Sequence, residues 1–209
     1  GTLVDRAADI ALSLNRALAD LGLGAVTEAQ VRDWVGRGAA RLIEVALQHV
    51  VPHHAQDPQK HAVETRLLAA FMARYQDSVC EASTVYPGVA EFVAAARDAG
   101  IRLACVTNKP YRPAVALLEA LNLLDAFELI IGGDSLAHKK PHPEPLLHCL
   151  RHFEVTAAQA LMVGDSRNDV DAAKAAGVKS LALPYGYNHG ESIEACEPDR
   201  LVASLAELI

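Results

Sequence analysis

Two aspartates follow a short apolar run and are the first residues in the chain suited to chemistry. Asp165 and Asp169 come after residues 161–164 and open an alanine-rich segment that ends near Gly177. A strand that runs into a helix N-terminus places its turn at the carboxyl edge of a parallel sheet, where α/β proteins bind ligands. Two carboxylates four residues apart can face one point and suit Mg2+, although an aspartate before a helix is more often an N-cap.

Two other predicted strand ends carry groups that suit the same chemistry. Thr107 and Asn108 follow the apolar run 101–106, and Lys140 precedes Pro141. A transferring phosphoryl group needs hydroxyl and amide donors, a cation and a metal-binding carboxylate. Taken singly, Thr107 is explained as a strand-end residue and Lys140 as a solvated charge. Their order along successive strand–helix units favours a phosphoryl-transfer site.

The elements that must position these residues alternate between strand and helix from residue 86 onward. The pattern predicts strands over 101–107, 128–131, 161–164 and 178–183, with helices over 88–97, 113–121, 144–152, 165–177 and 198–208. Such alternation indicates an α/β fold with a doubly wound parallel sheet and helices on both faces.

Residues 5–79 instead have helical periodicity throughout. Thr27 and Gln30 form a capping-box pattern, and Gly36-Arg37-Gly38 interrupts the helices. We therefore predict a discontinuous core domain of residues 1–10 and 82–209, with a helical domain of residues 11–81 inserted in it. Asp5 is expected to cap the first helix.

Bulk composition excludes several classes of protein. The 209 residues are 51% hydrophobic and 22% charged, with a net charge of −7, which is typical of a globular protein and argues against nucleic acid as the main partner. No apolar run is long enough to span a membrane. The scattered cysteines predict reduced thiols and a cytoplasmic location: Cys80, Cys105, Cys149 and Cys196.

Short motifs occur in order from the first residue to the last predicted helix. They are Gly1-Thr2-Leu3-Val4-Asp5, Trp34-Val35-Gly36-Arg37-Gly38-Ala39, Tyr86-Pro87-Gly88-Val89, Val106-Thr107-Asn108-Lys109-Pro110, Ile131-Gly132-Gly133-Asp134-Ser135, Lys139-Lys140-Pro141, Met162-Val163-Gly164-Asp165-Ser166-Arg167-Asn168-Asp169 and Tyr185-Gly186-Tyr187-Asn188-His189-Gly190. In this set the sequence resembles the haloacid dehalogenase-like (HAD) superfamily of phosphatases, most closely the bacterial phosphoglycolate phosphatases. No single motif is decisive, but the ordered set is specific.

The resemblance implies a Rossmann-like core with an inserted α-helical cap, and Mg2+-dependent hydrolysis of a phosphomonoester through an aspartyl-phosphate. The implied substrate is 2-phosphoglycolate, cleaved to glycolate and phosphate. Asp165 is then the metal ligand, and Asp169 orients Lys140 or a metal-bound water. The other implied core groups bind or neutralise the phosphoryl group: Thr2, Thr107, Asn108 and Lys140.

Within the helical domain, the resemblance points to Gly36, Arg37 and Gly38 as a specificity loop. Arg37 or Arg41 could bind a substrate carboxylate. The alternative is that both arginines are solvated surface charges. Zinc is not expected, because no glutamate or cysteine framework is visible beside the histidines: His49, His53, His54, His61, His138, His142, His148 and His152.

One departure concerns the first family motif, Asp-x-Asp-Gly-Thr. The printed chain starts at the Gly of this motif, so the nucleophile and the general acid are expected in about five to ten residues upstream of Gly1, on an apolar strand. That strand would be central in the sheet, between the strands that end at Thr107 and Gly164. An inactive truncation is the other interpretation.

Several rival functions stay open at this point. The chain could be a HAD phosphatase or phosphomutase for a sugar phosphate or pyrophosphate, a dehalogenase, or an inactive phosphate-binding homologue. The expected partner is a small phosphorylated substrate, with neither nucleic acid nor membrane, and the chain is expected to be a monomer or homodimer.

Overall fold

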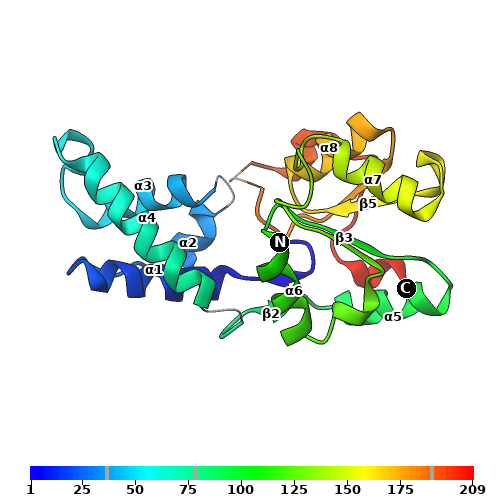
Figure 1. The fold of residues 1–209 in the computed structure, drawn as a ribbon, viewed down its shortest axis with the longest axis horizontal. Coiled ribbons are helices and arrows are strands. Elements are labelled where there is room, and N and C mark those ends of the chain that lie inside the picture. Colours follow the sequence, from blue (N-terminus) through cyan, green and yellow to red (C-terminus); the bar gives the residue numbers. More distant parts are fainter. Residues whose placement is uncertain (36–37, 78–79, 189–190) are drawn as a thin grey trace. The chain divides into compact units, whose positions relative to one another are not determined.

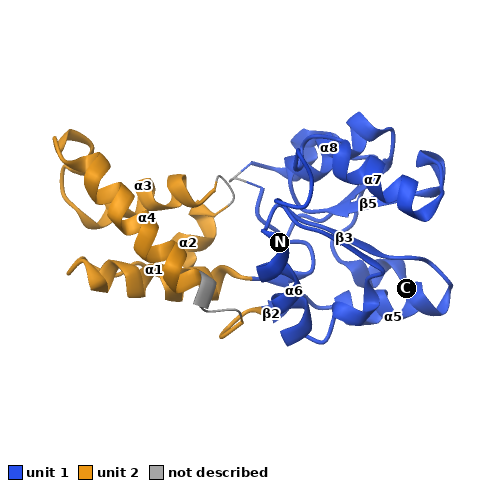
Figure 2. Ribbon diagram, viewed as in Figure 1, with its two compact units in different colours: residues 1–5, 84–209 blue, residues 6–83 orange. Residues whose placement is uncertain are grey.

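The computed structural model describes residues 1–35, 38–77, 80–188 and 191–209. The chain divides into two compact units, a core unit of residues 1–5 and 84–209 and a helical unit of residues 6–83 (Figure 2). Strands β1 (Val4–Asp5) and β2 (Thr84–Val85) pair antiparallel where the chain leaves the core unit and returns to it. No helix in the described ranges is long and apolar enough to cross a membrane.

Strands and helices alternate through the core unit (Figure 1). Its parallel strands form two hydrogen-bonded groups, β3 (Ala104–Val106) with β4 (Leu129–Ile131), and β5 (Leu161–Gly164), β6 (Lys179–Ala182) and β7 (Arg200–Leu201) in that order. Helices lie on both sides of the strands: α7 (Glu144–Phe153) and α8 (Arg167–Ala176) on one, α5 (Val89–Asp98) and α6 (Tyr111–Ala120) on the other. The predicted α/β class is confirmed.

The turn from β5 into α8 follows from local sequence. Ser166 and Asp169 form a capping box at the start of α8, and Gly177 ends the helix with a φ of 70°, where a side chain would be strained. The inward face of α8 buries Ala172 and Ala173 against Val178 and Leu146. These small residues let the helix approach the sheet closely, so the turn has a fixed position.

Two sequence-based expectations about the core unit are wrong. Residues 198–208 do not form one helix, because Arg200–Leu201 pair with β6 and only Leu205–Leu208 make a short 3-10 helix. Pairing with a buried neighbouring strand outweighs the local helical pattern. Asp5 does not cap α1 (Ala7–Asp20): the cap residue is Arg6, and Asp5 lies in β1.

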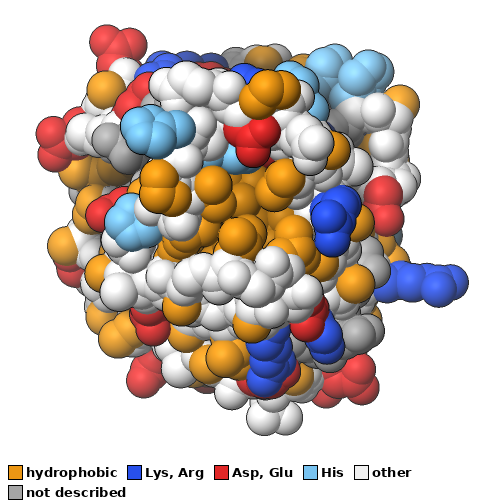
Figure 3. All heavy atoms as spheres, turned by 90° about the vertical axis from the view of Figure 1, so that its left-hand side faces the viewer, with side chains coloured by type: hydrophobic (Ala, Val, Ile, Leu, Met, Phe, Trp, Pro, Cys, Tyr) orange, Lys and Arg blue, Asp and Glu red, His pale blue; other side chains and the backbone are white. Residues whose placement is uncertain are grey.

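The helical unit is built from α1, α2 (Glu28–Trp34), α3 (Ala39–Val50) and α4 (Lys60–Asp77), with a 3-10 turn at His54–Gln56. The capping box of Thr27 and Gln30 is present as predicted. The helices bury one shared apolar cluster, which includes Leu14, Leu18, Ile43, Leu47, Leu67 and Phe71. On the face drawn in Figure 3, hydrophobic side chains gather in a central hollow bordered by charged side chains and histidines. A small folded unit buries a smaller fraction of its surface than a large one, so some apolar surface stays exposed.

A buried aspartate closes the helical unit where the chain leaves it. Asp9 on α1 is 2% exposed. Its carboxylate accepts backbone N–H bonds from Glu81 (3.2 Å), Ala82 (2.6 Å) and Ser83 (3.0 Å), and a bond from the Ser83 hydroxyl. A carboxylate is the compact group that can satisfy so many donors at once.

We expect the substitution Asp9→Ala to lower the free energy of unfolding by about 3 kcal/mol, because buried donors lose a charged acceptor. Urea unfolding followed by Trp34 fluorescence measures this in the helical unit, since the single tryptophan lies there. Asp20→Ala is the matched control, because Asp20 only pairs with Arg74 at the surface. Equal losses in both variants would contradict the assignment.

Candidate active site

A buried ion pair stands at the centre of the site. Lys140 lies in the loop before α7, and its Nζ donates to Asp169 Oδ1 at 2.6 Å and to the carbonyl oxygen of Val106. Lys140 is 8% and Asp169 4% exposed. Charges removed from water this far need partners, and each of these has several. The contacts join the end of β3, the start of α8 and the Lys140 loop.

Asp169 also organises the turn in which it lies. Its Oδ2 accepts bonds from the backbone N–H of Asp165 (3.0 Å) and Ser166 (3.1 Å) and from the Ser166 hydroxyl (2.9 Å). A Cβ on Gly164 would lie 2.2 Å from the Cβ of Asp169, so only glycine fits there. Both oxygens of Asp169 thus have partners, and its carboxylate faces Lys140 while that of Asp165 faces elsewhere.

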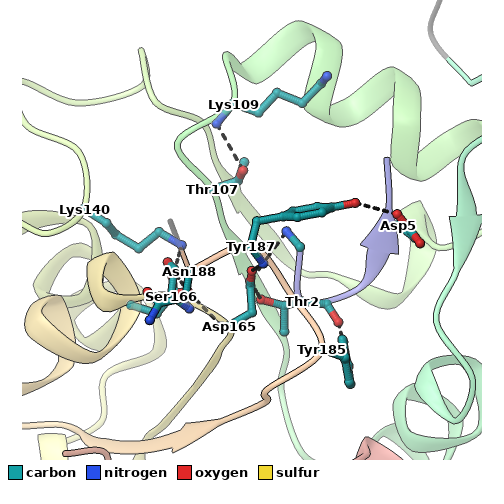
Figure 4. Close-up of polar contacts among 12 residues, drawn as sticks. Thr2, Asp5, Thr107, Lys109, Lys140, Asp165, Ser166, Tyr185, Tyr187 and Asn188 are labelled. Atoms are coloured by element: carbon teal, nitrogen blue, oxygen red, sulfur yellow. Dashed lines mark hydrogen bonds and ion pairs between the residues drawn. The ribbon is translucent and has the colours of Figure 1, made fainter. Parts of the chain in front are cut away.

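Asp165 is held by two segments that are distant from it in sequence, the start of the chain and the loop at Tyr187 (Figure 4). The hydroxyl of Thr2 donates to its Oδ1 at 2.6 Å, the N–H of Tyr187 donates to its Oδ2 at 2.9 Å, and the nitrogen of Gly1 lies 3.5 Å from Oδ1. Burial raises the pKa of this carboxyl, whereas the hydrogen bonds from Thr2 and Tyr187 and the positive charge of Lys140 lower it. The carboxylate of Asp165 is only 6% exposed, so these donors take the place of water around it.

Thr107 and Asn108 directly follow β3, whose last residue, Val106, contacts Lys140. The N–H of Thr107 extends the ladder by donating to Ile131 O at 2.9 Å, and the Thr107 hydroxyl accepts from the N–H of Lys109 at 3.1 Å. Asn108 Nδ2 donates to the carbonyl oxygen of Lys140 at 2.8 Å. The Oδ1 of Asn108 is buried with no hydrogen-bond partner among the described residues, which makes it a polar group available to a ligand or water.

The structure therefore brings five of the predicted residues into one network, which runs from Asn108 through Lys140, Asp169 and Asp165 to Thr2. Thr107 borders it through Val106, whose carbonyl binds Lys140. A cation, an ionised carboxylate, hydroxyls and unoccupied polar atoms at one sheet edge can bind and neutralise a phosphate ester.

Residues 185–188 form a supporting loop whose role the sequence did not reveal. A Cβ on Gly186 would lie 2.2 Å from the Cβ of Asp165, so the backbone must pass without a side chain. The Tyr185 hydroxyl donates to Thr2 O at 2.9 Å, the Tyr187 hydroxyl donates to Asp5, and Asn188 Oδ1 accepts from the N–H of Arg167 at 2.7 Å. The Tyr-Gly-Tyr-Asn pattern can be seen in the sequence, but its supporting role follows only from these contacts. His189 and Gly190 lie outside the described residues.

The predicted residues of the helical unit are described only in part. Gly36 and Arg37 lie outside the described residues. Gly38 precedes α3 with a φ of 91°. Arg41, on the first turn of α3, forms an ion pair with Glu44 on the same helix, and its side chain is 43% exposed.

Comparison with known proteins gives the class that this site belongs to. Residues 1–183 match the family model described as haloacid dehalogenase-like hydrolase. A phosphoglycolate phosphatase of Nitrosococcus oceani is 42% identical over 208 residues, covering 100% of this chain and 91% of that protein. The chain belongs to the haloacid dehalogenase-like hydrolase family, and its named relatives support a phosphatase enzyme.

Solved structures agree in fold. A crystal structure of a predicted phosphoglycolate phosphatase from Haemophilus somnus has a TM-score of 0.87 and 34% identity, and covers 100% of this chain and 92% of its own. The structure of CbbY from Rhodobacter sphaeroides in complex with phosphate has a TM-score of 0.73 and 30% identity, with the same coverage of both chains. The similarity therefore extends over both units.

The ion pair generates a stability prediction. We expect Asp169→Ala to lower the free energy of unfolding by about 3–5 kcal/mol, because it leaves Lys140 buried without its partner. Urea unfolding followed by far-UV circular dichroism measures the loss. Glu128→Ala, which removes the exposed partner of Arg102 and His152, should change stability much less. If Asp169→Ala lowered the free energy of unfolding no more than Glu128→Ala does, the ion pair of Lys140 and Asp169 would not hold the turns together.

Proposed function

We propose that this chain is a Mg2+-dependent phosphomonoester hydrolase. Its proposed substrate is 2-phosphoglycolate, which it hydrolyses to glycolate and phosphate. The observation that carries the proposal is the contact network of Asn108, Lys140, Asp169, Asp165 and Thr2. It joins phosphate-binding donors, a fixed cation and an ionised carboxylate, which are the groups that phosphoryl transfer requires.

In this proposal the phosphate ester lies beside Lys140. The ammonium neutralises charge on the phosphoryl oxygens, and its hydrogen bond to Asp169 fixes its position. The hydroxyl of Thr107 and the backbone amide of Asn108 donate to phosphoryl oxygens. Because these donors are anchored before the substrate binds, little reorganisation is required during the reaction.

Asp165 fits a Mg2+ ligand. Its Oδ1 accepts a hydrogen bond from Thr2 and its Oδ2 accepts one from Tyr187, and a carboxylate oxygen has more than one lone pair to offer. Thr2 and Tyr187 orient the carboxylate, which is the support that metal ligands usually have. When bound, Mg2+ would offset the repulsion between a carboxylate nucleophile and an anionic ester. Thr2 acts here through Asp165, a positioning role that differs from the substrate contact expected from the sequence.

The nucleophile and general acid are the two aspartates that the family resemblance puts immediately before Gly1. The first carboxylate attacks phosphorus, and the bond to the glycolate oxygen breaks as the second carboxyl protonates that oxygen. Water then attacks the aspartyl-phosphate, the second carboxylate takes its proton, and phosphate leaves. Support for this location comes from β3 and β5, which are not hydrogen-bonded to each other within the described ranges.

The choice of 2-phosphoglycolate is supported by the names of the relatives. This substrate carries a carboxylate as well as a phosphate, so it calls for a second cation. Arg37 and Arg41 are the proposed partners of that carboxylate, on either side of Gly38. A substrate panel with sugar phosphates and pyrophosphate distinguishes the rival specificities.

The main test is the rate of phosphate release from 2-phosphoglycolate, with Mg2+ and after its removal by EDTA. The assay compares the 209-residue chain with the same chain carrying any segment that its gene encodes upstream of Gly1. We expect turnover only in the longer form and only with Mg2+. Equal turnover by the 209-residue chain would place the nucleophile elsewhere.

Asp165→Asn should lower kcat in the active form by about 100-fold or more, because the neutral amide cannot offset the metal charge. Asp171→Asn, on the helix α8 that follows Asp165, is the matched control and should leave kcat unchanged. Retention of Mg2+-dependent activity by Asp165→Asn would exclude Asp165 as the metal ligand.

Substituting Arg37 and Arg41 together by Gln should raise KM for 2-phosphoglycolate by about tenfold or more, since a charged hydrogen bond is lost. KM for a neutral sugar phosphate should change little. Arg32→Gln is the control, because Arg32 pairs with Glu28 on the surface of α2. An unchanged preference between the two substrates would contradict the role of these arginines.

A further inference from the structure

A second group of metal-binding side chains lies outside the network described above. One nitrogen from each of His138 and His142 and one oxygen from Glu144 all lie within 4.8 Å of one another. The expectation that no glutamate accompanies these histidines is therefore wrong. The sequence hid the set because its spacing, four residues and then two, spans a loop and the start of α7 rather than one helix face.

The three side chains already contact each other. Glu144 Oε2 accepts from the backbone N–H of His138 at 2.8 Å and lies 2.9 Å from Nδ1 of the same residue. The rings of His138 and His142 stack with their centroids 4.1 Å apart and an interplanar angle of 22°. The stacking keeps the two imidazoles side by side, with ring nitrogens of both near the carboxylate of Glu144.

The loop that carries these groups is held at two points, Lys140 and Glu144. Lys140, between the two histidines, is anchored through Asp169 and Val106, and Asn108 binds the carbonyl oxygen of Lys140. Glu144 is the first residue of α7, where the helix N-terminus favours a carboxylate. The hydrogen bond from His138 lowers the pKa of Glu144, so the carboxylate is charged at neutral pH. A fixed loop loses little entropy on binding an ion.

We propose that His138, His142 and Glu144 bind one borderline transition-metal dication, of which Zn2+ is the representative. Two imidazoles and a carboxylate form a three-ligand zinc set, with water completing the tetrahedron. Mg2+ prefers oxygen ligands and does not compete well for imidazoles. The site is thus chemically distinct from Asp165.

Binding requires only small movements. Ligand atoms around tetrahedral zinc lie about 3.4 Å apart, given metal–ligand distances of about 2.0–2.2 Å. Nδ1 of His142 accepts a 3.2 Å bond from the N–H of Glu144, which a metal at that nitrogen would replace. Lys139 lines a surface hollow together with His138 and His142, and its positive charge opposes the binding of a cation.

The test is a calorimetric titration of the metal-free 209-residue chain with ZnCl2, in an excess of MgCl2 that occupies oxygen-only sites. We expect one Zn2+ per chain. The variants His138→Ala, His142→Ala and Glu144→Gln should each weaken binding by at least about tenfold. Lys139→Gln should strengthen it, since a repelling charge is removed. The melting temperature of the original chain should rise with ZnCl2, and that of His142→Ala should not.

His61→Ala is the matched control. His61 is an exposed histidine that also pairs with a glutamate, Glu64, but it belongs to the helical unit. This variant should bind Zn2+ as the original chain does. Absence of Zn2+ binding in the original chain would overturn the proposal. So would unchanged binding in all three ligand variants, or loss of binding in His61→Ala alone.

Discussion

The ion pair of Lys140 and Asp169 is the interaction on which the rest of the site depends. Burying a charged pair is favourable only when the remaining donors and acceptors are also satisfied. Here the carboxylate accepts three bonds from the turn before α8, and the ammonium reaches the carbonyl at the end of β3. One pair thus sets the relative positions of three turns that are distant in sequence.

Asp165 is held in a different way. Its neighbours are a backbone N–H from the loop 185–188 and a hydroxyl from the start of the chain, so it remains an acceptor-rich anion. Gly164 and Gly186 allow this, because each passes a carboxylate side chain more closely than a Cβ would permit. The two carboxylates of one turn therefore differ in their partners: Asp169 is neutralised by Lys140, and Asp165 is held by a hydroxyl and a backbone N–H.

Charge is distributed to suit an anionic substrate on an anionic protein. The chain carries a net charge of −7, yet the site contains a buried lysine, Lys140, beside which the proposed function puts the phosphate. Local cations act strongly at low exposure, whereas the surface carboxylates are screened by solvent and salt. The histidine cluster beside Lys140 extends this principle, since its nitrogen donors select a different class of ion from the oxygens of Asp165.

The sequence predicted the class of fold and most elements, because amphipathic periodicity and capping boxes such as Thr27 with Gln30 are local properties. It also proposed Thr107, Lys140, Asp165 and Asp169 as site residues, since each occupies a turn after a strand or before a helix. It failed where pairing is non-local: Arg200–Leu201 pair with β6 as a strand, and Asp5 binds Tyr187 instead of capping α1.

Tertiary structure alone decided which groups meet. That Lys140 reaches Asp169 and that Tyr187 supports Asp165 depends on loops brought together by helix and sheet packing. Short-range patterns contain no information about such contacts, because side chains about 20 or more residues apart are positioned by the burial of the elements between them.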